Sequence, residues 1–110
     1  MSNTFRLKTK SSVGVTTVGI YTATSPVTAT VIIGITLANV TGTGINVGIG
    51  ITRATANSIS LMKNVPIPQG SSLEFMQGNK IVLEATDTLT AVSDTNNSLD
   101  VALTIMEITP

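Results

Sequence analysis

The strongest constraint on the fold is a period-two alternation of apolar residues with small or polar ones. Two segments show it most clearly, with aliphatic positions at Ile45, Val47, Ile49 and Ile51 and at Leu99, Val101, Leu103 and Ile105. Successive side chains of a β-strand point to opposite faces of a sheet, so this spacing predicts strands with one buried face. No segment carries an apolar stripe at helical spacing, and threonine, valine and isoleucine favour strands.

A third stripe, at Val31, Ile33, Ile35 and Leu37 with Ile32 on the back, predicts a central strand. Further strands are predicted at Val13–Thr22, Ser58–Val65, Ser72–Met76, Lys80–Ala85 and Thr88–Ser93. Four segments separate these strands: a turn at Thr41–Gly44, a rigid corner at Pro66–Gly70, a tight hairpin loop at Gly78-Asn79 and a polar loop at Asp94–Ser98.

Short strands spaced by such turns predict an all-β protein, an antiparallel, jelly-roll-like β-sandwich of about eight strands. The length of 110 residues suits one domain. We expect a single sandwich domain over residues 13–110. Residues 1–12 precede it as an extended N-terminal segment, either an arm or a first strand.

The composition excludes several classes of function. The chain has no cysteine and no histidine, so disulfides and the usual metal and cofactor ligands are missing, and we expect neither cofactor nor metal. Histidine bases and cysteine nucleophiles are also excluded, and we expect no enzymatic activity. Glu84 and Asp87, on either side of a short turn, are expected to be solvated rather than catalytic. The formal net charge is zero, which gives no reason to bind nucleic acid or a membrane.

The apolar content predicts a partner. Hydrophobic residues make up 42% of the chain and charged residues 11%, against roughly 25% charged in an average soluble domain. A domain of this size leaves considerable apolar surface outside its core. We therefore expect part of the surface to be covered in a homo-oligomer or a larger assembly.

The candidate interface residues are Phe5, Arg6, Leu7, Lys8 and Lys10, where apolar and basic side chains alternate before Ser11-Ser12 interrupts the pattern. One interpretation is an ordinary first strand. The other is an arm that adds a strand to the edge of a neighbour's sheet.

Charge is also segregated along the chain. Residues 1–73 carry five basic residues and no acid, whereas residues 74–110 carry six acids and only Lys80. Chance explains this pattern as well as head-to-tail complementarity between copies does. The second interpretation predicts assembly that weakens as ionic strength rises.

Several stretches together resemble small structural proteins of tailed bacteriophages, especially of bacteriophages that infect cyanobacteria. They are Asn3–Lys10, Val13-Gly14, Leu37–Thr41, Lys63–Ser72, Gln77–Ala85, Asp87–Leu89, Ser98–Val101 and Met106–Thr109. The resemblance covers nearly the whole chain and implies a component of the virion, without catalytic residues to carry over.

The sequence thus favours an accessory structural subunit that docks on a phage capsid, neck or tail, with copies of itself and other virion proteins as partners. The alternative is a receptor- or glycan-binding module of a tail or fibre. That function would need a concave site, which we expect around Tyr21 or the Asp94–Ser98 loop.

Overall fold

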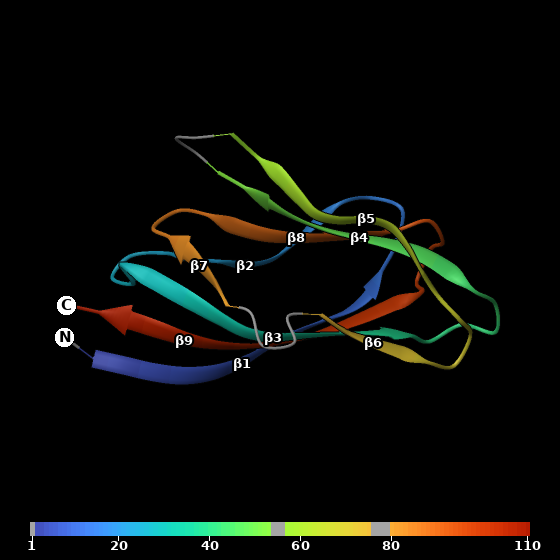
Figure 1. Ribbon diagram of the computed structural model, residues 1–110, viewed down its shortest axis with the longest axis horizontal. Helices are drawn as coiled ribbons and strands as arrows, with labels where there is room; N and C mark the ends of the chain where they lie inside the picture. The colour runs from blue at the N-terminus through green and yellow to red at the C-terminus, as the bar shows by residue number, and fades with distance from the viewer. Residues whose placement is uncertain (1, 54–56, 76–79) are drawn as a thin grey trace.

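The computed structural model describes residues 2–53, 57–75 and 80–110, and these ranges contain nine strands (Figure 1). The strands are β1 (Ser2–Val13), β2 (Val18–Thr22), β3 (Ala29–Asn39), β4 (Ile45–Thr52), β5 (Ile59–Ile67), β6 (Ser72–Phe75), β7 (Ile81–Glu84), β8 (Thr88–Ser93) and β9 (Leu99–Thr109). No helix in the described ranges is long and apolar enough to cross a membrane.

The strands form two antiparallel sheets that lie as two layers, with the chain ends side by side at one end of the molecule (Figure 1). Sheet A has the order β1-β9-β3-β6, with β7 also paired to β3, and sheet B has the order β2-β8-β4-β5. With β6 and β7 taken as one interrupted strand, this is the connectivity of an eight-stranded jelly roll. The predicted all-β sandwich is confirmed.

Strands β6 and β7 share one edge of β3 and do not form the predicted hairpin. Leu73 on β6 is opposite Leu37, and Val82 on β7 is opposite Val31, with both strands antiparallel to β3. They therefore run in the same direction, one after the other along β3. The hairpin prediction is wrong about this pairing, and its turn residues, Gly78-Asn79, lie outside the described residues.

The core lies between the sheets, and its positions follow the alternation predicted for β4 and β9. The central strand β3 departs from the prediction because a β-bulge between Ile32 and Gly34 shifts its phase. Ile32, Ile35 and Leu37 are therefore buried, while Val31 and Ile33 are half-buried. The prediction that Val31 and Ile33 share a face with Ile35 and Leu37 is wrong for this reason.

Two other predicted boundaries are wrong. The Val13–Thr22 strand is two elements, because Val13 ends β1 and β2 begins only at Val18. Pro66 does not begin the corner but lies on β5, where it pairs with Asn46 of β4; β5 is an edge strand and tolerates a proline. The corner lies at Pro68–Ser71, where Gly70 takes a φ of 66°. The predicted turn at 41–44 and the loop at 94–98 are confirmed.

Substituting Ile105 with alanine tests the core. Ile105 is fully buried on β9, so I105A should lower the free energy of unfolding by about 2–5 kcal/mol. Val82 is 56% exposed on the same sheet, so V82A should change the free energy of unfolding by about 0.5 kcal/mol or less. Urea titration of dilute monomer measures both variants. Equal losses in the two would contradict the core assignment.

Candidate assembly face

Phe5 and Leu7 lie on the outer face of sheet A. Directly opposite residues of an antiparallel pair point to the same side of a sheet. Phe5 is opposite Met106 and Leu7 is opposite Thr104, and these β9 residues alternate with buried Ile105. Phe5 and Leu7 therefore point away from the core, and they are 70% and 66% exposed.

An apolar row crosses the full width of this outer face. Phe5 on β1 is opposite Met106 on β9, and Met106 is opposite Val31 on β3. Val31 is in turn opposite Val82 on β7. Val82 is exposed, and the two central side chains are half-buried by their neighbours within the sheet. These residues are far apart in the sequence, so only the strand register brings them together.

The neighbouring rows widen this surface. Ile108 lies beside the row on β9, opposite Ala29, and Leu7 lies on its other side. We call the resulting surface the apolar band, which consists of Phe5, Leu7, Val31, Val82, Met106 and Ile108. Contiguous exposed apolar surface of this kind marks sites of association. The sequence pointed to Phe5 and Leu7, but not to the other four residues.

The outer face of sheet B has a different chemistry. Hydroxyl side chains lie on either side of a glycine strip there, with Val92 among them: Thr22, Thr52, Ser60, Thr88 and Thr90 surround Gly48 and Gly50. The hydroxyls of Thr22 and Thr88 lie 2.9 Å apart. A groove of about 290 Å³ runs over the glycines, and Lys63 is among the residues that line it. The apolar band thus belongs to sheet A, whereas the outer face of sheet B carries more hydroxyls, with Val92 and Met62 as apolar members of its groove.

The basic residues of β1 lie on the opposite side of the strand from Phe5 and Leu7. Each faces a buried β9 residue in the register: Arg6 with Ile105, Lys8 with Leu103 and Lys10 with Val101. These side chains therefore follow the rim of the sandwich. The five predicted interface residues divide between the two sides of β1, and their role as an interface stays a prediction.

Arg6 belongs to a polar network that joins the sheets. Its Nε donates to Oε1 of Glu107 at 2.6 Å, and the Tyr21 hydroxyl donates to Oε2 of the same carboxylate, also at 2.6 Å. The Tyr21 hydroxyl is also 2.9 Å from Oγ1 of Thr30. Tyr21 comes from sheet B and Glu107 from sheet A, so this network ties the layers together beside β1.

The network shifts the pKa of both acidic groups. The hydrogen bond from Tyr21 lowers the pKa of Glu107 below its ordinary value, and the hydrogen bond from Arg6 lowers it further, against the opposing effect of burial. Burial, together with the hydrogen bond to Glu107, raises the pKa of Tyr21 to about 12. Glu107 is therefore charged and Tyr21 neutral at neutral pH.

Substituting Glu107 with glutamine tests this network. A carboxylate whose pKa is lower in the folded chain adds stability above its unfolded-state pKa, and this stability is lost as pH falls through the folded-state pKa. E107Q should therefore lower the free energy of unfolding by about 1–2 kcal/mol at neutral pH. The deficit should shrink below about pH 4. Urea titrations at neutral and acidic pH measure it, and a pH-independent deficit would contradict this account.

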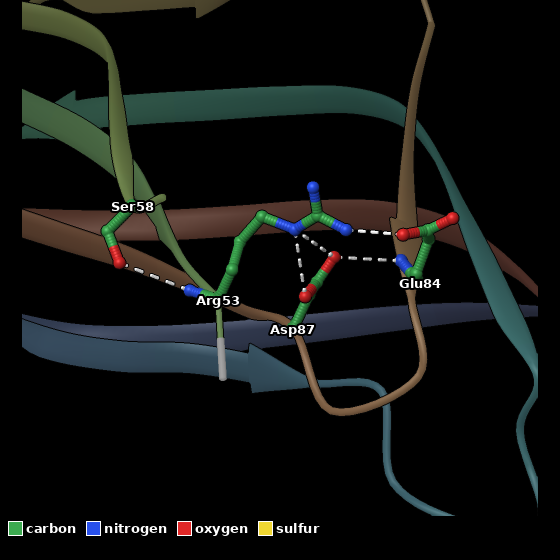
Figure 2. A network of polar contacts seen from close by, with 4 residues as sticks. All are labelled: Arg53, Ser58, Glu84 and Asp87. Carbon is green, nitrogen blue, oxygen red and sulfur yellow. Dashed lines mark hydrogen bonds and ion pairs between the residues drawn. The ribbon is translucent and has the colours of Figure 1, made fainter. Parts of the chain in front are cut away.

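A second network surrounds Arg53, which follows β4, and joins it to the turn between β7 and β8 (Figure 2). Its Nε donates to both carboxylate oxygens of Asp87 at 3.2 Å, and Nη2 donates to Glu84. Asp87 Oδ2 also accepts the Glu84 backbone N–H at 3.0 Å, and Ser58 Oγ accepts the Arg53 backbone N–H. Glu84 is mostly solvated as expected, whereas Asp87 is buried, which is contrary to the expectation that both would be solvated.

The burial of Asp87 predicts an unequal effect of two neutral substitutions. Arg53→Gln leaves the buried Asp87 carboxylate without its cation, and a buried charge without a partner is strongly unfavourable. Glu84→Gln removes a carboxylate whose side chain is 72% exposed. Thermal denaturation should therefore show a clearly larger fall in Tm for R53Q than for E84Q. The reverse order would contradict this assignment.

Part of the charge segregation is explained within the chain. Arg6 and Arg53, both from the basic part of the sequence, pair with three of the acids in residues 74–110. Two other acids accept backbone hydrogen bonds, Asp94 from Asn46 and Asp100 from Ser12. Fewer charges are thus available to a partner than the sequence suggested. Assembly that weakens with salt stays a prediction.

The two positions expected for ligand recognition are engaged within the chain. Tyr21 is only 8% exposed, so it offers no surface for stacking a sugar. In the 94–98 loop, Asp94 Oδ1 also accepts the hydroxyl of Thr95 at 3.0 Å, and the hydroxyls of Ser93 and Ser98 lie 2.6 Å apart. The placement of a recognition site around Tyr21 is wrong, because this side chain packs into the core.

A scan against protein-family models finds no match, and a search of curated proteins finds none either. Solved structures do match. A chain from the disulfide-linked pili of Bacillus endospore appendages aligns with a TM-score of 0.58 and 17% identity, over 99% of this chain and 88% of that one.

Two chains from infectious bursal disease virus are also similar. The chain from the T13 particle aligns with a TM-score of 0.59 and 13% identity over 97% of this chain. The chain from the Gx strain aligns with a TM-score of 0.52 and 10% identity over 96% of this chain. This chain spans 31% and 32% of those viral chains. At such low identity these likenesses establish the fold alone.

Proposed function

We propose that this chain is a structural subunit of a virus particle and that it acts by docking. Three observations support the proposal. The strand order is that of a jelly roll, an architecture found in viral capsid proteins. The fold is similar to that of chains in a virus particle. The sequence also resembles virion proteins of tailed bacteriophages over nearly its whole length.

The apolar band carries the proposal. Phe5, Leu7 and Val82 are each more than half exposed, and they lie on the same outer face as half-buried Met106 and Val31. Covering apolar surface stabilises an association by roughly 25 cal/mol for each Å² removed from water. The outer face of sheet B carries the hydroxyls of Thr52, Thr88 and Thr90 beside Val92. Docking through the outer face of sheet A therefore covers the apolar band and leaves the hydroxyls of sheet B in water.

The partners that we propose are copies of the chain itself and other virion proteins, in a homo-oligomer on a phage capsid, neck or tail. The similar pili are described as disulfide-linked. These 110 residues contain no cysteine, so the links proposed here are non-covalent. The proposal includes no catalysis. Glu84 and Asp87 bind Arg53, and Glu107 binds Arg6 and Tyr21, so these acids already have structural partners.

One observation favours the alternative of a receptor- or glycan-binding module. The groove on sheet B is lined by hydroxyls, including those of Ser58, Ser60 and Thr90, which could bond to a sugar. Among the described residues that line it, however, none is aromatic, and aromatic residues commonly provide the stacking surface for a sugar. We therefore rank this function second.

Sedimentation velocity of matched variants tests the docking proposal. Val82→Ser and Phe5→Ser introduce polar groups into the apolar band, so they should weaken self-association of the purified protein. Val40→Ser is the control, because Val40 is 54% exposed, close to the 56% of Val82, but lies in the loop after β3. V40S should assemble as the unmodified chain does.

Two outcomes would contradict the docking proposal. One is that V40S weakens assembly as much as V82S. The other is an unmodified chain that stays monomeric at every salt concentration while it binds host cells or glycans saturably. The second outcome would favour recognition, with the groove on sheet B as the site.

A further inference from the structure

Strand β1 adds almost nothing to the hydrophobic core. Of its residues Ser2–Val13, only Val13 is buried and only Lys8 is half-buried. The positions on the core side carry Arg6, Lys8 and Lys10, yet the β9 residues opposite them are at most 2% exposed. Because its side chains stay largely exposed, β1 is held chiefly by its backbone ladder with β9 and by the pair of Arg6 with Glu107.

A β-bulge separates the exposed part of β1 from Val13. Lys10 is opposite Val101 and Val13 is opposite Leu99, so β1 takes one residue more than β9 over this interval. Within it, Ser12 has a φ of 57°, in the left-handed region that a serine adopts at a cost. Gly14 follows. A change of backbone angles here would redirect residues 2–10 without moving the core.

The charges on β1 limit how a second copy can bind. Adding the β1 of a neighbour antiparallel to the free edge of β1 would bring two sets of Arg6, Lys8 and Lys10 together on one side, and like charges across strands repel. An exchanged β1 avoids this repulsion. It would pair with β9 of the neighbour, and its Arg6 would reach the same Glu107 carboxylate that it binds within its own chain.

We propose that copies of this chain exchange β1, so that residues 2–10 of one copy pair with β9 of the next and the Lys10–Val13 bulge is the hinge. The inference rests on the proposed function and specifies how the copies are linked. Both chain ends lie at one end of the molecule, where β1 follows the outer edge of sheet A (Figure 1). The exchanged strand re-forms every contact between β1 and β9, so a second copy of the chain is the matching partner.

An engineered disulfide tests the exchange. Leu7 and Thr104 are directly opposite each other on β1 and β9, at a spacing that a disulfide can bridge. The chain has no other cysteine. In the double variant Leu7→Cys, Thr104→Cys, oxidation of dilute monomer locks β1 onto its own β9. The oxidised protein should then lose self-association, and reduction of the same sample should restore it.

A lock on another strand pair is the control. Thr36 and Ala102 are opposite each other on β3 and β9, which stay together in the exchange. The oxidised double variant Thr36→Cys, Ala102→Cys should assemble as well as its reduced form does. Mixing the single variants L7C and T104C under assembling conditions and then oxidising them should give a disulfide between two chains on a non-reducing gel.

Two results would overturn the exchange. If the oxidised Leu7–Thr104 lock assembles as well as its reduced form and the mixed single variants give no cross-chain disulfide, copies dock without exchanging β1, and the proposed function stands. If the unmodified chain does not self-associate, docking between copies fails together with the exchange. Sedimentation velocity of the unmodified chain beside the locked samples separates these results.

Discussion

The packing of β3 and β9 against sheet B is the interaction on which the rest of the structure depends. Ile32 and Ile35 of β3 and Leu103 and Ile105 of β9 are at most 1% exposed, in the middle of the core. Because side chains alternate along a strand, burying one set fixes the direction of the other set. Met106 must therefore face outward, beside its neighbours on β1 and β3.

This constraint makes the two outer faces of the sandwich unequal. On sheet A the outward set includes the apolar band, and on sheet B it includes Thr52, Thr88 and Thr90 beside the glycines of β4. The same alternation places Phe5 and Leu7 on the outer face and the cations of β1 along the rim. A chain whose apolar band lies on one outer face can dock with that side toward a neighbour, as the proposed function requires.

Much of the fold could be predicted from the sequence, because regular alternation marks β4 and β9 and polar turn residues mark their ends. The prediction failed where a feature is not local. The bulge after Ile32 is set by the pairing of β3 with β9, and β6 and β7 are arranged by their common neighbour, β3. Pro66 is tolerated only because β5 is an edge strand, which its sequence does not reveal.

The candidate site was predictable only in part. Phe5 and Leu7 stand out because they alternate with basic residues within a few positions. Val31, Val82 and Met106 belong to three different strands, and no short pattern connects them. In the sequence, they differ from their surroundings only in being apolar on the side of the strand that faces solvent, where polar residues are expected. The pairing of Arg6 with Glu107 likewise depends on the two chain ends meeting in sheet A.

The central claim is that another copy or another virion protein covers the outer face of sheet A. Labelling single cysteines with a maleimide tests it directly, because the chain has no cysteine of its own. Val82→Cys places the probe in the apolar band, and Ser60→Cys places it on the polar face of sheet B. Assembly should slow the labelling of V82C strongly and leave that of S60C unchanged. Equal labelling of V82C in the assembled and dissociated states would contradict the claim.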